Sequence, residues 1–177
     1  RAQARSYNSC RPSPVSRMGR NRHRVEMTWD RGHVSLRRGR VSEPGRAYLV
    51  TCVVWNRAPV FRDHRAARMA SRIIDAAGTW KGAECLAWVL MPDHVHVLLR
   101  FDDRDLSKVV ASVRSRLTRA FRAEGRTSPL WQRAFQDRAL RHDEDLRTVA
   151  RYIVANPLRA GLVAHVCDYP YWNAIWL

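Results

Sequence analysis

The feature that most constrains the fold is a predicted β-hairpin at residues 84–101. Residues 84–90 and 94–101 are rich in apolar side chains, and Met91, Pro92 and Asp93 lie between them. Apolar runs of this length bounded by a turn are typical of strands, and proline fixes φ and ends a ladder of hydrogen bonds. The two segments are therefore predicted to pair antiparallel across a tight turn.

The second strand of this hairpin carries two histidines, His94 and His96, at the start of an apolar alternation. Because side chains alternate between the faces of a strand, both imidazoles are expected on one face and Val95 and Val97 on the other. Two imidazoles on one face form a chelating pair, although His-x-His alone is weak evidence for a metal site.

The flanking segments alternate between strand-like and helix-like patterns. Residues 47–55 predict a central strand, and residues 63–78 repeat apolar side chains at helical spacing. A second helix is predicted from a cap at Asp105 to about Ala123, a fourth strand within residues 130–140, and a third helix from a cap at Asp143 to a stop at Pro157. The order β-α-β-β-α-β plus a helix predicts an α+β fold, a ferredoxin-like antiparallel sheet with packed helices.

The end of the third predicted helix carries Tyr152 and Asn156, one turn apart on the flank of its apolar stripe. The amide oxygen of Asn156 is a hard neutral ligand, and together with His94 and His96 it leaves positions on Mg²⁺ or Mn²⁺ open for phosphate oxygens. The phenol of Tyr152 is a poor nucleophile at a free pKa of about 10, but a cation on the scissile phosphate favours its attack. These residues predict DNA cleavage through a covalent phosphotyrosine bond.

The charge of the chain indicates a polyanionic partner. Its 177 residues include 32 Lys and Arg against 16 Asp and Glu, a formal net charge of +16, and the isoelectric point is near 11.2. Nucleic acid is the partner expected for such a protein.

The first 40 residues differ in character from the rest. They hold eleven arginines against Glu26 and Asp30 and show no sustained periodicity. We expect residues 1–40 to form a basic, largely disordered arm and residues 41–177 to form one domain. The arm can be a solvated tail or can contact a DNA groove, and Met18 is an alternative translation start.

Two further features bear on the compartment. No apolar run reaches the roughly 18 residues needed to cross a bilayer, and the four cysteines, Cys10, Cys52, Cys85 and Cys167, form no C-x-x-C pair. We therefore expect no membrane partner, buried or free thiols, and a location in the cytoplasm or on the nucleoid.

Three motifs resemble those of the REP-associated tyrosine transposases, a branch of the single-tyrosine HUH endonuclease superfamily. They are LMPDHVHVLL at residues 90–99, LWQRAF at 130–135 and RYIVANPLRAGLV at 151–163, with RGRVS at 38–42 and DYPYW at 168–172 in support. The resemblance runs from about residue 37 to the end, and the arginine-rich extension before it has no counterpart.

This resemblance implies roles for four residues. His94 and His96 are expected to be the histidines of the HUH motif, Tyr152 the nucleophile, and Asn156 the polar metal ligand. It also implies an endonuclease and strand transferase that acts on single-stranded DNA with palindromic hairpins, using Mg²⁺ or Mn²⁺ and a 5′-phosphotyrosine intermediate.

The expected DNA contacts are basic side chains for the phosphates and an indole ring for base stacking. They are Arg114, Arg116, Arg119 and Arg122 on the second helix, Arg151, Arg159 and the arm, and Trp131 or Trp172.

Alternatives stay open at this point. The chain can be a hairpin-specific DNA-binding protein of this fold that does not cut, or an RNA-binding module, although such modules carry aromatic side chains where this sequence has histidines. It can act as a monomer, or as a homodimer in which the tyrosine helix of one copy serves the histidines of the other.

Overall fold

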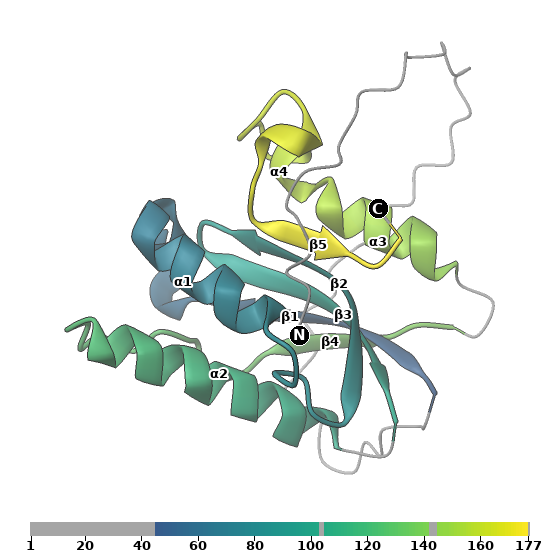
Figure 1. Cartoon of the computed structure of the whole chain (residues 1–177), viewed down its shortest axis with the longest axis horizontal. Helices are drawn as coiled ribbons and strands as arrows, with labels where there is room; N and C mark the ends of the chain where they lie inside the picture. Colours follow the sequence, from purple (N-terminus) through teal and green to yellow (C-terminus); the bar gives the residue numbers. More distant parts are fainter. Residues whose placement is uncertain (1–44, 103–104, 142–144, 177) are drawn as a thin grey trace, which may run out of the picture. The chain divides into compact units, whose positions relative to one another are not determined.

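The computed structural model of the chain describes residues 45–102, 105–141 and 145–176 (Figure 1). Its strands are β1 (Ala47–Val53), β2 (Ala83–Met91), β3 (His94–Phe101), β4 (Gln136–Ala139) and β5 (Trp172–Ala174). Its α-helices are α1 (His64–Asp75), α2 (Leu106–Ala123), α3 (Leu146–Val154) and α4 (Asn156–Arg159), and single turns of 3-10 helix are η2 (Trp55–Arg57), η3 (Val60–Arg62) and η4 (Val166–Asp168). The predicted arm, residues 1–40, lies outside the described residues, so its division from a domain of residues 41–177 stays a prediction.

The five strands form one antiparallel sheet in the order β4-β1-β3-β2-β5. The strands β1 and β3 are central, and α1 and α2 connect β1 to β2 and β3 to β4. This is the split βαβ arrangement, so the predicted ferredoxin-like α+β fold is confirmed.

The three longer helices all begin at an aspartate whose carboxylate accepts hydrogen bonds from the first turn. Asp63 caps α1, Asp105 caps α2 and Asp145 caps α3. Such caps typically stabilise a helix by about 1 kcal/mol each. The prediction of Asp143 as the cap of α3 is wrong, because Asp145 accepts from the backbone N–H of Arg147 at 3.0 Å.

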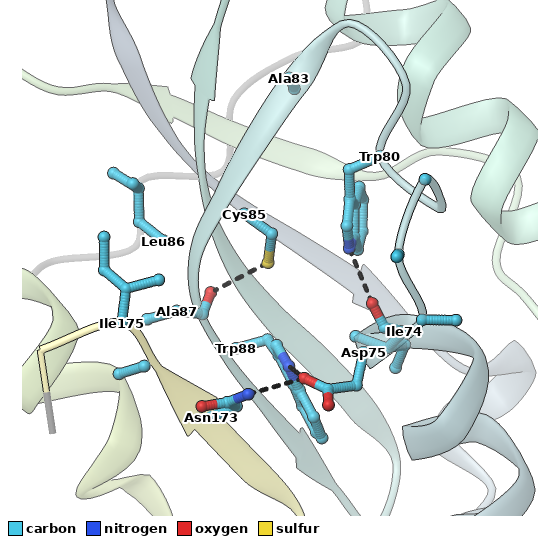
Figure 2. A pocket seen from close by; sticks show the side chains of 14 residues that line it. Ile74, Asp75, Trp80, Ala83, Cys85, Leu86, Ala87, Trp88, Asn173 and Ile175 are labelled. Carbon is cyan, nitrogen blue, oxygen red and sulfur yellow. Dashed lines mark hydrogen bonds between the residues drawn. The ribbon is translucent and has the colours of Figure 1, made fainter. Parts of the chain in front are cut away.

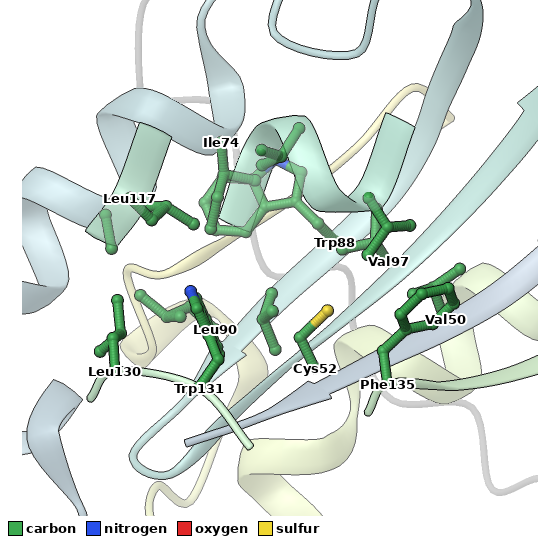
Figure 3. Close-up of a cluster of buried hydrophobic side chains, with 14 of the residues drawn as sticks. Val50, Cys52, Ile74, Trp88, Leu90, Val97, Leu117, Leu130, Trp131 and Phe135 are labelled. Carbon is green, nitrogen blue, oxygen red and sulfur yellow. The ribbon is translucent and has the colours of Figure 1, made fainter. Parts of the chain in front are cut away.

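Alternation along the strands divides the sheet into two faces. Val95 and Val97 of β3 belong to the main hydrophobic core together with the buried side chains of α1 and α2, so these helices cover one face (Figures 1 and 3). His94 and His96 point to the other face, and α3 packs there through contacts with β2, β3 and β5 (Figure 1). The helix that carries Tyr152 therefore covers the histidine face of the sheet.

The edge strand β5 is not among the predicted elements, since three residues are too few to show a period of two. It pairs antiparallel with β2, with Trp172 opposite Val89. Asn173 donates from Nδ2 to Oδ1 of Asp75 at 2.7 Å, and the same oxygen accepts from Nε1 of Trp88 at 3.2 Å (Figure 2). These bonds join the C-terminal segment to the end of α1.

Two expectations about compartment can be compared with the structure. Cys52 and Cys85 are reduced thiols, but Cys167 is disulfide-bonded, so the expectation of thiols is wrong at Cys167. Cys10 lies outside the described residues. None of the helices in the described ranges is both long and apolar enough to cross a membrane.

Candidate active site

The two histidines of β3 bring their Nε2 atoms together. These atoms lie 3.1 Å apart, with the ring centroids separated by 4.6 Å and the ring planes at 80°. On β3, His96 is flanked by Thr51 of β1 and Val89 of β2, and His94 by Val53 and Met91. Because both neighbours of each histidine are strand residues, the pair is held on a rigid part of the sheet.

His96 is buried and held from its second nitrogen. Its side chain is 6 % exposed, and Oγ1 of Thr51 lies 2.8 Å from Nδ1. The pKa of His96 is lowered to about 3, chiefly by burial and next by the charge of His94. The charge of Arg159 lowers this pKa further, whereas the charge of Asp93 raises it. The imidazole is therefore neutral near pH 7, and with its proton on Nδ1 it donates to Thr51 and directs the lone pair of Nε2 toward His94.

His94 is oriented in the same way by a carboxylate. Oδ1 of Asp93 lies 2.5 Å from Nδ1 of His94, and Arg57 donates from NH1 to Oδ2 of Asp93 at 3.1 Å. Burial acts to raise the pKa of Asp93, but the hydrogen bonds and charges of His94 and Arg57 outweigh it and leave the pKa below its usual value. Asn56 and Arg57 have φ of 53° and 51°, and this left-handed pair folds the chain back toward Asp93.

The geometry of the pair fits two cis ligands of one cation. Two nitrogens at 90° and about 2.1 Å from a metal ion lie about 3.0 Å apart, close to the observed separation of the Nε2 atoms. Histidines that bind a metal through Nε2 typically hydrogen-bond a protein group through Nδ1, as His96 does with Thr51 and His94 with Asp93. No group of three or more His, Cys, Asp or Glu side chains in the described residues is arranged to hold a metal ion.

Tyr152 lies on α3, the helix that covers the histidine face of the sheet. It is partly exposed on α3, and Cζ of Arg159 lies 4.0 Å from the centroid of its ring. The charge of Arg159 also acts on His96, so this guanidinium lies within electrostatic range of the buried histidine as well as against the tyrosine ring.

Asn156 follows a break in the predicted helix. The prediction of one helix through residue 156 is wrong, because α3 ends at Val154 and Asn156 begins α4. Pro157 has no N–H to donate to the carbonyl of Ile153, four residues earlier, and Nδ2 of Asn156 donates to that carbonyl instead, at 2.8 Å. The amide nitrogen is thereby occupied, and the amide oxygen is the atom that can act as a ligand.

The predicted arginine contacts fall into two groups. Arg151 and Arg159 are exposed near Tyr152, whereas the arginines of α2 lie across the sheet from the histidines. Arg119 and Arg122 are exposed there. Arg114 donates to the carbonyl of Gln132, and Arg116 donates to Oγ1 of Thr79 at 2.9 Å, so both have structural partners.

The prediction of Trp131 as a base-stacking side chain is contradicted by its burial. It is 8 % exposed, packs against Phe61 and donates from Nε1 to the carbonyl of Arg114 at 3.3 Å (Figure 3). Trp172 is half-buried and donates to the carbonyl of Val166 at 3.3 Å. By contrast, Trp55 beside the Asp93 turn is 46 % exposed.

Four residues near the site were missed at the level of sequence: Thr51, Arg57, Asp93 as a partner of His94, and Trp55. Thr51 carried a usable signal, since it is a polar residue inside an otherwise apolar strand. Asp93 adjoins His94 directly and was assigned only to the turn. The role of Arg57 depends on left-handed backbone that no local pattern indicates.

Comparison with known proteins identifies the family of the chain. Residues 45–156 match the family described as "Transposase IS200 like". A REP-associated tyrosine transposase of Escherichia coli is 32% identical over 90 residues, 50% of this chain and 52% of that protein. A protein of Haemophilus influenzae provisionally given the same name is 32% identical over 100 residues, 50% of this chain and 57% of that protein. The chain thus spans little more than half the length of these relatives.

A solved structure of a REP-associated tyrosine transposase bound to a REP hairpin has a similar fold. It superposes with a TM-score of 0.59 at 26% identity, covering 76% of this chain and 79% of that one. The matched family region contains both histidines, Tyr152 and Asn156. By the extent of that match, more than half of its length, the chain belongs to the family of IS200-like transposases.

Proposed function

We propose that this protein is a metal-dependent endonuclease and strand transferase that acts on single-stranded hairpin DNA through a covalent 5′-phosphotyrosine. The observation that carries the proposal is the 3.1 Å approach of the Nε2 atoms of His94 and His96 on the sheet face covered by the helix of Tyr152. The solved relative is a complex with a REP hairpin, which supports hairpin DNA as the partner.

His94, His96 and Asn156 are the residues that would hold a divalent cation, Mg²⁺ or Mn²⁺. Two imidazoles and one amide oxygen supply no negative charge, so the phosphate of the substrate complements the site. When bound, such a cation withdraws charge from the scissile phosphate.

Tyr152 supplies the nucleophile. Its phenol oxygen forms a bond to phosphorus while the bond from phosphorus to the 3′-oxygen breaks; the phenol proton is released and the departing 3′-oxygen gains a proton. The 5′ end of the DNA stays on the tyrosine. Attack by another 3′-hydroxyl reverses the step and joins new strands.

Arg159 and Arg151 are placed to contact phosphates beside the tyrosine, and Arg119 and Arg122 to contact DNA elsewhere. For base stacking we propose Trp55 in place of Trp131, because its ring is exposed next to the histidine turn. The packing of α3 on the histidine face and the effect of the Arg159 charge on His96, both within one chain, favour a tyrosine that serves its own histidines. A protein with this function works on the DNA of the nucleoid, in the cytoplasm.

The test is adduct formation with a labelled hairpin oligonucleotide and Mn²⁺. The wild type should give a protein–DNA band that resists denaturant, and Tyr152→Phe should bind the hairpin in native gels without giving this band. Adduct formation by Tyr152→Phe would exclude this nucleophile. Hairpin binding by the wild type without any adduct would identify a non-cleaving hairpin binder instead.

A further inference from the structure

The chain has only two lysines among its 32 basic residues, and both line the same pocket. Lys81 lies in the turn between α1 and β2, and Lys108 lies in the first turn of α2. The pocket has a volume of about 510 Å³, and its other described lining residues include Thr79, Ser112 and Arg116. Two lysines that lie 27 positions apart in the sequence, together with Arg116, thus line one cavity.

Arg116 is fixed at the wall of this pocket. It donates from NH1 to Oγ1 of Thr79 at 2.9 Å, and this hydroxyl donates in turn to the carbonyl of Ile73 at 2.7 Å. Thr79 is 4 % exposed, so its hydroxyl is a rigid anchor. A guanidinium has five N–H donors, and those that do not face Thr79 remain for a ligand.

Asp105 is the only acidic residue among the described residues that line the pocket. Its Oδ1 atom accepts from the backbone N–H groups of Ser107 at 2.6 Å and Lys108 at 3.2 Å. Its carboxylate is thus engaged as the cap of α2. Among the described lining residues, three cationic side chains against one engaged carboxylate give a net positive charge, which suits an anion with several oxygen acceptors.

The pocket is separate from the histidine site. It is formed by α2 and the turn after α1, which lie on the sheet face opposite α3 (Figure 1). An anion bound there contacts neither His96 nor Tyr152, and a role in the cleavage step itself is excluded by this placement.

We propose that this lysine pocket binds phosphate groups. Compact ammonium groups act as point charges on phosphate, and a fixed guanidinium adds directed hydrogen bonds. The volume accommodates a diphosphate or two neighbouring phosphates of a DNA backbone. DNA as the source rests on the proposed function, whereas the phosphate chemistry of the pocket does not.

The two lysines provide a direct test, because they carry the only side-chain amines of the sequence. An amine-specific acylating reagent therefore labels no side chain other than Lys81 and Lys108. The full-length protein is labelled alone, with a hairpin oligonucleotide, or with inorganic pyrophosphate, and the modification rates of Lys81 and Lys108 are measured by peptide mass spectrometry. A ligand at about ten times its dissociation constant should slow labelling of both lysines roughly tenfold. The amine introduced by Arg72→Lys, on the exposed side of α1, serves as a control and should react at an unchanged rate.

Each outcome decides the proposal. Protection of both lysines by the hairpin alone assigns the pocket to the DNA backbone, and protection by pyrophosphate assigns it to a free nucleotide or diphosphate. Protection by neither ligand overturns the proposal, even where hairpin binding and the tyrosine adduct are intact. If the protein forms no tyrosine adduct but both lysines are still protected, the proposed catalysis is overturned and phosphate binding in the pocket is supported.

A salt titration provides a second measurement. The double variant Lys81→Gln, Lys108→Gln should lower the slope of log affinity for the hairpin against log salt by roughly 1.4 to 1.8, the value for two phosphate contacts. Arg68→Gln, Arg72→Gln removes the same charge from exposed positions on α1 and should change the slope by less than half of that. Equal changes of the slope in both variants would mean that the lysine pocket contributes only general surface charge to hairpin binding.

Discussion

The guanidinium of Arg159 lies over the ring of Tyr152, with Cζ 4.0 Å from the ring centroid. A cation over an aromatic face is attracted to it by about 0.5–2 kcal/mol, which is enough to restrict the ring. The same charge acts on His96. Arg159 therefore acts on both the proposed nucleophile and the proposed metal site.

We expect Arg159→Ala to slow single-turnover cleavage by roughly 10- to 100-fold, about 1.4–2.8 kcal/mol, because the ring loses its partner and the phosphate loses a cation. Hairpin affinity in native gels should fall much less. Arg147→Ala is the matched control, since it removes an exposed arginine from α3 to which no DNA contact is assigned. Free guanidinium ion added to Arg159→Ala should restore part of the rate; no restoration, together with an equal loss in Arg147→Ala, would contradict a positioning role.

Thr51 should set the metal affinity through His96. Thr51→Val keeps the shape of the side chain but removes the acceptor 2.8 Å from Nδ1 of His96, and it should weaken Mn²⁺ binding roughly 10- to 100-fold. Thr51→Ser retains the hydroxyl and should bind Mn²⁺ nearly as the wild type does. Calorimetric titration of Mn²⁺ measures both. Tight binding by Thr51→Val would show that the hydroxyl does not orient the ligand.

The buried His96 should make the metal-free protein sensitive to mild acid. Because burial and the charge of His94 lower its pKa to about 3, the unfolded chain takes up a proton first as the pH falls, from about pH 6.5 downward. Stability is therefore lost as the pH falls through this range. In urea unfolding with a chelator present, the wild type should lose about 1 kcal/mol more than His96→Asn between pH 6 and pH 5. Equal losses would mean that His96 titrates normally.

The histidine face was predictable from the sequence, because strict alternation from His94 to Leu99 fixes which side chains share a face. The side chains that contact the histidines were not predictable in this way. Thr51 meets His96 through the register between β1 and β3, which depends on the pairing of residues 45 positions apart. The packing of α3 on the sheet is hidden in the same way, because it depends on contacts with strands that are distant in sequence.

The end of α3 shows why local rules failed there. Helix periodicity continues through Asn156, and Pro157 was predicted to stop one helix. The chain instead breaks at Ala155 and starts α4, with the Asn156 amide bonded to the carbonyl of Ile153 that Pro157 cannot reach. A side chain assigned only to metal binding thus also serves the backbone, and that double use depends on a geometry that no residue pattern shows.

Trp55 and Trp131 should separate DNA binding from stability. Trp131 is 8 % exposed in the main core, so Trp131→Ala should lower the free energy of unfolding by about 3–5 kcal/mol. Trp55 is 46 % exposed beside the turn of Asp93, so Trp55→Ala should cost little stability but weaken binding of single-stranded DNA by about 1–3 kcal/mol, the value of one stacked base. Urea unfolding and fluorescence anisotropy with a labelled hairpin oligonucleotide measure the two quantities. Trp55→Phe keeps an aromatic face and should retain most of the affinity. Full affinity in Trp55→Ala would show that this ring does not stack on the DNA.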